Sequence, residues 1–233
     1  MKKTSHPRKI VVPGDILAEK WKNPPIYGTY LDGDKLCSSV VGVVEVKNDR
    51  VKIIPLQGKY IPREGDKVIG KIIEVRFSNW LVDVNAVYPV TMHVADVVSG
   101  KIDVQNTDIR KIYDVGDVVY GVISRIDELR RVSMSCKGKG LGKIRGGRLL
   151  TLTYAKVPRL IGRGGSMINL IREKMNLRYI IGQNGIIWVD GPDRDIELMA
   201  NMINMIEKES HTTGLTDRVR AMLEESMESD SNG

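Results

Sequence analysis

The feature that most constrains this sequence is a glycine-rich loop between two apolar segments, residues 159–166, RLIGRGGS. Gly162, Gly164 and Gly165 remove side chains that would keep a sugar-phosphate backbone away from the main-chain amides. Arg163 places a positive charge where the glycines make room. The loop therefore predicts a phosphate-binding site.

The residues after the loop predict the start of a helix. Apolar residues recur at helical spacing from Met167 to Met175, and Ser166 is expected to be the N-cap. A helix N-terminus presents unpaired amides and a partial positive charge, so it attracts anions. The bound phosphate then belongs either to a nucleotide or to RNA.

Nucleotide-binding motifs fit these residues poorly. The phosphate loop of nucleotidases needs a lysine and then a serine or threonine after its last glycine, but Ser166 follows Gly165 directly. A dinucleotide-binding fingerprint needs a third glycine where Met167 and Ile168 stand. An enzyme that uses the loop to bind a nucleotide stays open as an alternative from another class.

The elements predicted around the loop favour RNA. Alternating and branched residues predict strands at 149–157, 178–181 and 186–189, and the Asn-Gly pair within 182–185 is a hairpin signal. A last helix is predicted from Pro192, with an apolar stripe at helical spacing. The loop therefore lies inside a small α/β domain.

The order of strand, short helix, Gly-x-x-Gly loop, helix, hairpin and helix resembles a KH domain of type I, βααββα, over residues 148–209. The resemblance implies that single-stranded RNA is held across the loop. The residues that it assigns to RNA binding are Arg159, Gly162, Arg163, Gly164, Gly165 and Ser166.

Residues 63–137 have a different pattern, with short strands that begin after Gly-Asp turns. One strand-start phrase occurs twice, as GDKV at 65–68 and GDVV at 116–119. Short, evenly spaced strands are typical of a small barrel. The segment resembles the S-one RNA-binding domain, a five-stranded barrel of the OB fold, and this resemblance assigns His93, Asp127 and Arg131 to an RNA-binding face.

The aromatic residues of this segment do not stand where the S-one family has its stacking pair. Those two positions fall on Ser78 and Leu81, whereas Phe77 and Trp80 are each displaced by one residue. On a regular strand that displacement points them to the opposite face. Either a β-bulge restores them to the RNA side, or the barrel binds RNA through charge alone; Trp80 packing between domains is a further alternative.

Residues 138–147 contain glycines and only positive charges, which predicts a solvated linker between the two modules. Lys139, Lys143 and Arg145 are expected to contribute salt-sensitive affinity for RNA that passes from one module to the other. In the tail, residues 210–233, a short helix is predicted at 216–225. Its inward residues are Val219, Met222 and Leu223, and the acidic, serine-rich end is predicted to be disordered.

Residues 1–62 are predicted to form a third, N-terminal β domain. The phrases VPGD at 12–15 and YIPREGD at 60–66, followed by the glycine loop, make the whole chain similar to the RNA-binding cap subunits of the archaeal exosome. That family implies an N-terminal domain docked on a hexameric ring of phosphorolytic nuclease subunits, with three caps around the entrance pore. Such a cap recruits single-stranded RNA, favours tails such as poly(A), guides the strand into the 3′-to-5′ degradation pore and does no chemistry.

Composition fits a non-catalytic partner of a polyanion. The chain has 233 residues, a net charge of +7 and a pI near 9.3, enough for two or three small domains. Cys37, Cys136 and three scattered histidines argue against a zinc site, and no sequence signature gathers the carboxylates that a two-metal nuclease needs. No catalytic residue, metal or cofactor is expected, and no apolar run is long enough to span a membrane, so a cytoplasmic location is expected. A free-standing translation- or ribosome-associated RNA-binding factor stays open as an alternative.

Overall fold

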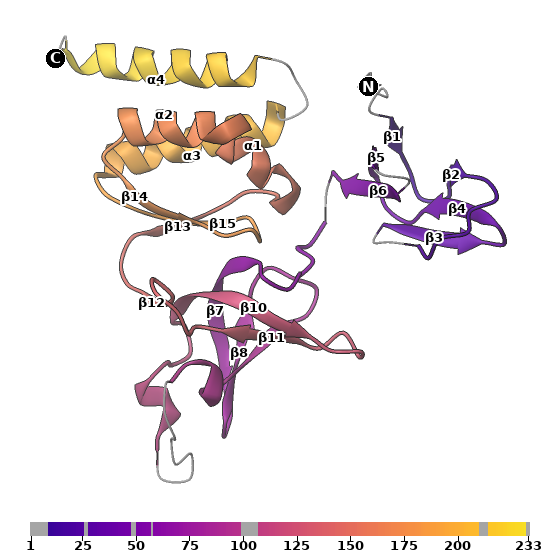
Figure 1. The fold of residues 1–233 in the computed structure, drawn as a ribbon. Coiled ribbons are helices and arrows are strands. Elements are labelled where there is room, and N and C mark those ends of the chain that lie inside the picture. The colour runs from indigo at the N-terminus through magenta and orange to yellow at the C-terminus, as the bar shows by residue number, and fades with distance from the viewer. Residues whose placement is uncertain are drawn as a thin grey trace. The chain divides into compact units, whose positions relative to one another are not determined.

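The computed structural model describes residues 9–25, 28–47, 50–56, 58–98, 107–209 and 214–231. The chain divides into two compact units, residues 1–58 and residues 59–233 (Figure 1). The division falls at Gly58 and Lys59, slightly before the expected boundary at residues 62 and 63. The barrel and the KH domain, which the sequence separates by a linker, belong to one unit.

The N-terminal unit consists of two three-stranded antiparallel sheets. The first has the order β1-β5-β6, with β1 at Ile10–Val11, β5 at Gly42–Lys47 and β6 at Arg50–Pro55. The second has the order β2-β4-β3, with β2 at Ile16–Ala18, β3 at Thr29–Asp32 and β4 at Lys35–Ser38. The buried side chains of the N-terminal unit include Val11, Leu36, Cys37 and Ile53. The predicted N-terminal β region is confirmed.

The next segment forms the predicted five-stranded barrel. Its strands are β7 (Lys67–Val75), β8 (Asn79–Asp83), β9 (Val90–His93), β10 (Val118–Ile126) and β11 (Val132–Ser135). The sheet order is β11-β9-β8-β7-β10, and β11 also pairs with β10, which closes the barrel. Two 3-10 turns, η1 (Val94–Asp96) and η2 (Ile109–Lys111), follow β9.

The basic segment after the barrel is not a free linker. Gly142–Ile144 forms strand β12, which pairs antiparallel with β10. The indole nitrogen of Trp188 donates to the carbonyl oxygen of Gly146 at 2.8 Å. A Cβ on Gly147 would lie 2.6 Å from that indole nitrogen, so glycine is required at this contact. Residues 138–147 are exposed or half-buried, as expected of a solvated segment, but backbone pairing and the Trp188 contact hold both its middle and its end.

The last part of the chain has the element order βααββα of a type I KH domain, which confirms the predicted fold. The strands are β13 (Arg148–Thr151), β14 (Arg178–Ile181) and β15 (Ile186–Asp190), in the sheet order β13-β15-β14. The helices are α1 (Val157–Ile161), α2 (Ser166–Lys174) and α3 (Asp193–Glu209), with short turns η3 (Tyr154–Lys156) and η4 (Arg163–Gly165) before and after α1. The helices lie on one face of the sheet (Figure 1).

The strand predicted at 149–157 ends earlier than expected. β13 stops at Thr151, and the chain is helical from Tyr154 onward. Pro158 stands in the first turn of α1, where its fixed φ favours a helix and its missing N–H costs nothing. The helical conformation nevertheless begins at Tyr154, before Pro158, so the proline favours only the helix that follows.

A fourth helix, α4 (Leu215–Ser231), packs against the KH helices. Val219 and Leu223 are buried in the same apolar core as α2 and α3, and Met222 is partly buried against it. The predicted inward face is confirmed. The acidic end predicted to be disordered is instead helical as far as Ser231, because it continues a helix that the core already anchors.

The KH hairpin joins the KH domain to the barrel. Asn184, between β14 and β15, is fully buried, and its amide nitrogen donates to the carbonyl oxygens of Ile69 at 2.7 Å and Val84 at 2.9 Å. The neighbouring Gln183 exchanges hydrogen bonds with the backbone of Lys67, at 2.6 Å and 2.8 Å. These bonds fix the barrel against the KH sheet.

Candidate nucleic-acid interface

The glycine loop has a backbone that only glycine adopts easily. Gly162, Gly164 and Gly165 have φ angles of +80°, +61° and +82°. A Cβ on Gly162 would lie 2.6 Å from the backbone nitrogen of Met167, so any side chain there would clash with the first turn of α2. Gly162 is therefore required for the turn itself.

The other two glycines face open space. A Cβ on Gly164 would meet no atom within 4 Å, and one on Gly165 would meet only the Cγ2 of Ile168 at 3.7 Å. None of the residues that the structure describes fills the space over this backbone. The main chain at these two glycines is therefore accessible, and phosphate binding there stays a prediction.

Two amides of the loop are used within the loop. The N–H of Gly165 donates to the carbonyl oxygen of Gly162 at 3.3 Å, and the N–H of Ser166 donates to that of Arg163. These bonds hold the loop shape without a ligand. A phosphate would then be bound by the free amides in the first turn of α2 and by arginine side chains.

Ser166 does not cap the helix as predicted. The N-cap is Gly165, in the left-handed conformation, and no side chain caps the helix. Ser166 is the first residue of α2 and is exposed. The positive φ of Gly165 brings the chain directly into the helix, which leaves no extended residue to act as a side-chain cap.

The charge around the loop is positive. Arg159 and Arg163 are both exposed, and residues 154–172 contain no carboxylate. The structure therefore brings together all six loop residues that the KH resemblance assigns to RNA binding. An anion at this surface meets no neighbouring negative charge from its own segment.

The segment that leads into the loop is tied to α3 by one carboxylate. Glu207 accepts hydrogen bonds from the backbone nitrogen of Thr153 at 2.9 Å and from its hydroxyl at 2.7 Å. Lys156 donates to the same carboxylate at 2.5 Å and to the Glu207 carbonyl oxygen at 2.6 Å. Partial burial would raise the pKa of Glu207, but the bonds from Lys156 and Thr153 hold it below the ordinary value.

On the barrel, Asp127 and Arg131 lie together and form an ion pair. The Arg131 backbone nitrogen and guanidinium Nε donate to the two oxygens of Asp127 at 2.8 Å and 2.7 Å. These bonds hold the pKa of Asp127 below its ordinary value, and the bond from the Arg131 backbone contributes most. The Arg131 side chain stays 76% exposed, so its remaining donors face solvent.

His93 is not part of the same cluster. The parallel pairing of β9 with β11 places Thr91 opposite Ser133. Arg131 comes two residues before that pair and His93 two residues after it, so they lie about 13 Å apart along the strand direction. His93 is exposed at the end of β9, where its cross-strand neighbour is Asn79.

The two displaced aromatic residues, Trp80 and Phe77, differ in burial. Trp80 is fully buried inside the barrel, and its indole nitrogen donates to the carbonyl oxygen of Tyr113 at 2.8 Å. The bulge in β7, between Ile72 and Glu74, does not bring it to the surface. Phe77, in the turn before β8, is 73% exposed. Of these two aromatic residues, Phe77 is the one that is accessible at the surface.

The basic residues of the segment 138–147 differ in their contacts. Lys139 and Arg145 are exposed, whereas Lys143 on β12 forms an ion pair with Asp117 at 2.6 Å. Partial burial would raise the pKa of Asp117, but its bonds from Lys143 and from the Asp114 amide hold it below its ordinary value. The predicted contribution of Lys143 to RNA affinity stays a prediction, and the ion pair with Asp117 would reduce it.

Sequence reasoning missed two residues that position the interface, Asn184 and Glu207. The Asn-Gly pair of the hairpin reads as a turn signal, which hides the contact that the asparagine makes with a distant strand. In the sequence, Glu207 looks like any other charged residue of an amphipathic helix. The only sequence signal for the role of Asn184 was that a polar residue stands between Gly182 and Gly185. The sequence contained no signal for the role of Glu207.

Among the described residues, no three His, Cys, Asp or Glu side chains come together as metal ligands could. None of the helices searched in the described part of the chain is long and apolar enough to cross a membrane.

An OB-type barrel rigidly joined to a KH domain with an open, arginine-bearing glycine loop defines a nucleic-acid-binding protein of the KH class. Residues 8–57 match the family model described as the exosome RNA binding protein RRP4 N-terminal domain, and residues 150–205 match the KH domain model. The chain belongs to the Rrp4 family of exosome complex components.

Relatives across most of the chain carry the same assignment. It is 46% identical to the exosome complex component Rrp4 of Thermococcus kodakarensis, over 93% of this chain and 85% of the relative. It is 42% identical to that of Methanothermus fervidus, over 95% of this chain and 97% of the relative. A crystal structure of a proposed exosome complex RNA-binding protein superposes with a TM-score of 0.68 at 32% identity, covering 73% of this chain and 98% of that one.

Proposed function

We propose that this chain is a cytoplasmic, non-catalytic cap subunit of the exosome that recruits single-stranded RNA and guides it to the nuclease subunits. The observation that carries the proposal is the glycine loop, whose backbone at Gly164 and Gly165 is open to solvent beside two exposed arginines. Its membership in the Rrp4 family supplies the assembly in which it acts.

The RNA path begins at the KH loop and continues over the barrel. The phosphates lie at the loop residues with Arg159 and Arg163, and the strand then passes Lys139 and Arg145. On the barrel, Arg131 and His93 make separate contacts, and Asp127 orients Arg131. The fixed joint between the two domains supports a single, continuous track.

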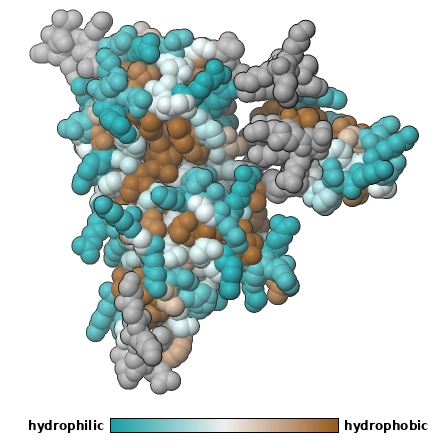
Figure 2. Space-filling view, viewed as in Figure 1, coloured by the Kyte–Doolittle hydropathy of each residue, from teal (hydrophilic) through white to brown (hydrophobic). Residues whose placement is uncertain are grey.

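The N-terminal unit is the part that docks on the nuclease ring. Figure 2 shows hydrophobic residues at the surface of this unit, and seven of its large apolar side chains are exposed. They are Ile10, Val12, Ile16, Tyr30, Leu31, Val41 and Val46. Three copies placed on a hexameric ring, around its entrance pore, would bury these surfaces and deliver RNA tails such as poly(A) to the centre.

The carboxylates at the interface support a role without chemistry. Asp127 is held by Arg131, Asp117 by Lys143 and Glu207 by Lys156. Each is used to position a cation or a backbone segment. None is left free to hold a catalytic metal with the others.

Fluorescence anisotropy with a labelled single-stranded RNA tests the loop. The double substitution Gly164→Asp with Gly165→Asp adds side chains and negative charge at open positions, so we expect affinity to fall at least tenfold while the circular dichroism spectrum is unchanged. Unchanged affinity in the folded variant would remove the loop from the interface.

Co-purification tests the assembly and the alternatives. The full chain should recover the nuclease ring subunits. Recovery of ribosomal particles in their place would favour a free-standing translation factor. Metal-dependent nucleotide hydrolysis by the purified chain would favour an enzyme.

A further inference from the structure

Tyr88, in the loop between β8 and β9, has a ring that the barrel does not use for packing. It is 79% exposed, more than any other large hydrophobic side chain that the structure describes. Its side chain makes no hydrogen bond and no ring contact with the described residues. Most of the ring is therefore accessible to a ligand.

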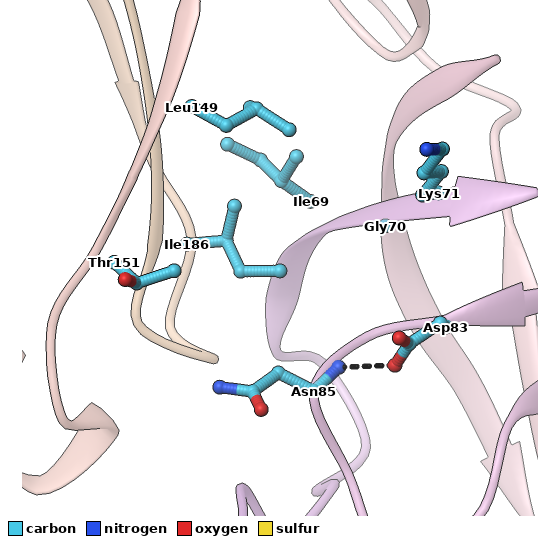
Figure 3. A pocket seen from close by; sticks show the side chains of 8 residues that line it. All are labelled: Ile69, Gly70, Lys71, Asp83, Asn85, Leu149, Thr151 and Ile186. Atoms are coloured by element: carbon cyan, nitrogen blue, oxygen red, sulfur yellow. Dashed lines mark hydrogen bonds between the residues drawn. The ribbon is translucent and has the colours of Figure 1, made fainter. Parts of the chain in front are cut away.

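The loop that carries Tyr88 is fixed on the barrel. Asn85 lines a pocket between the barrel and the KH sheet, and its backbone nitrogen donates to the Asp83 carboxylate at 2.8 Å (Figure 3). The carbonyl oxygen of Asn85 accepts from the backbone nitrogen of Tyr60 at 3.1 Å, and Ala86 forms a β-bridge with Tyr60. Because Tyr60 is buried, these contacts hold the first half of the loop in place.

Pro89 restricts the backbone of Tyr88 itself. A proline disfavours the helical region for the residue before it, which leaves mainly extended conformations. Val90, the next residue, is buried at the start of β9. The aromatic ring is thus presented by a segment with few accessible conformations, and this lowers the entropic cost of binding.

Arg131 lies at the same end of the barrel as Tyr88. β9 and β11 are parallel neighbours with Thr91 opposite Ser133, so the segments that lead into them start side by side. Tyr88 precedes its paired strand residue by three positions and Arg131 by two. On extended segments the two residues then differ by about 3.3 Å along the strand direction, and neighbouring strands are about 4.8 Å apart. One nucleotide can therefore contact both side chains.

The turn that carries Arg131 is also fixed. The Asp127 backbone nitrogen donates to the carbonyl oxygen of Arg131 at 3.0 Å, and the Arg130 nitrogen donates to that of Asp127 at 2.9 Å. The Arg131 side chain is 76% exposed and keeps guanidinium donors for a phosphate. Two exposed apolar side chains, Val87 and Leu129, belong to the same two segments. An aromatic ring beside a cation is the combination on which single-stranded nucleic acids stack and bind.

We infer that Tyr88 stacks on one base of the RNA strand while Arg131 binds an adjacent phosphate; the inference rests on the proposed function. Tyr88 then supplies the aromatic ring that the two stacking positions of the S-one family lack in this chain. Val84, at the start of the same loop, accepts a hydrogen bond from Asn184 of the KH hairpin, so this base lies where the barrel adjoins the KH domain. Every base has a π-face, so the contact is expected to tolerate any base.

Substitutions of the ring in the full chain test the inference. In anisotropy titrations with a labelled oligoadenylate, Tyr88→Ala should bind about tenfold more weakly than the wild type, whereas Tyr88→Phe keeps the ring and should bind equally well. Tyr88→Leu keeps an apolar side chain without a ring and should lose nearly as much as Tyr88→Ala. The control Val115→Ala removes an exposed apolar side chain from the turn before β10, at the other end of the barrel, and should bind as the wild type does.

Abasic oligonucleotides assign the contact to a base. Oligoadenylates with one abasic residue at each position in turn should include one position that costs the wild type about tenfold in affinity. That penalty should disappear in Tyr88→Ala and persist in Tyr88→Phe. Tyr88→Ala should leave the salt dependence unchanged, whereas Arg131→Ala should lower the slope of log K against log salt by about 0.7.

The outcomes separate this inference from the proposed function. If Tyr88→Ala binds RNA as the wild type does, while the glycine-loop variant loses binding, the stacking inference is wrong and the cap function stands. If Tyr88→Ala weakens only the recovery of ring subunits, Tyr88 contacts a protein and the inference is also wrong. Wild-type affinity in Tyr88→Leu would contradict stacking, because any apolar side chain would then suffice. If the wild-type chain binds no RNA, both proposals fail.

Discussion

The side-chain amide of Asn184 forms hydrogen bonds with both backbone groups of Ile69. Its nitrogen donates to the Ile69 carbonyl oxygen at 2.7 Å, and its oxygen accepts from the Ile69 N–H at 3.3 Å. One asparagine of the KH hairpin thus takes the place of a paired strand for one residue of the barrel. Because the contact is fully buried, water cannot replace it.

Asn184→Ala should strongly weaken the joint between the domains. It leaves the N–H and carbonyl of Ile69 and the carbonyl of Val84 without partners, and we expect a loss of about 3 kcal/mol in the free energy of unfolding. Urea denaturation measures it. Gln183→Ala is the control, since Gln183 is exposed and water can replace its side-chain oxygen as the acceptor for the Lys67 N–H. Equal losses in the two variants would contradict the assignment.

Gly162→Ala and Gly164→Ala should differ sharply in stability. Both put alanine at a positive φ, which costs about 1–2 kcal/mol, but only Gly162→Ala also forces a Cβ to within 2.6 Å of a backbone nitrogen. We expect the first to lose at least about 3 kcal/mol and the second about 1 kcal/mol. Thermal unfolding of the two variants checks the order, and a reversed order would mean that the loop has a different backbone.

Glu207→Gln should change how stability depends on pH. The pKa of Glu207 is lowered in the folded chain, so its contribution is present above the ordinary value of 4.5 and is lost as the pH falls through the folded pKa. The carboxylate is 38% exposed and partly screened, so we expect a loss of about 1 kcal/mol at pH 7 and a smaller difference at pH 3. Melting temperatures at both pH values measure it, and an equal difference at both would exclude the ion pair as its source.

Arg163→Ala should reduce the salt dependence of RNA binding. For single-stranded nucleic acid, each neutralised phosphate contributes about 0.7 to the slope of log K against log salt, so we expect the slope to fall by that amount. Lys143→Ala should leave the slope nearly unchanged, because Asp117 already pairs with Lys143. A larger effect of Lys143→Ala would mean that RNA displaces Asp117.

Phe77→Ala and Trp80→Phe should separate binding from stability. Phe77 is exposed in a turn, so its removal should leave the fold intact and lower RNA affinity about tenfold if it stacks on a base. Trp80→Phe leaves the buried carbonyl oxygen of Tyr113 without a donor and should cost about 1–3 kcal/mol of stability without changing affinity. If Phe77→Ala binds RNA as the wild type does, Phe77 does not stack on a base.

The sequence by itself determined what depends on neighbouring residues. The glycine loop, the helix behind it, the βααββα order and the Gly-Asp strand starts could all be predicted, because glycine conformation and apolar spacing are local properties. The inward face of α4 could be predicted for the same reason. The alternating pattern failed after Thr151, where Glu207 of a distant helix holds Thr153 and Lys156 and the chain turns into η3.

Only the tertiary structure decided which polar and aromatic residues are free to bind. Asn184 and Ile69 are 115 residues apart, and Lys143 and Asp117 are 26 apart, so neither partner can be identified from periodicity. The same holds for Trp80, whose displacement by one residue is resolved only when the barrel closes around it. Burial and pairing are properties of segments that meet in space, and a pattern along one segment does not contain them.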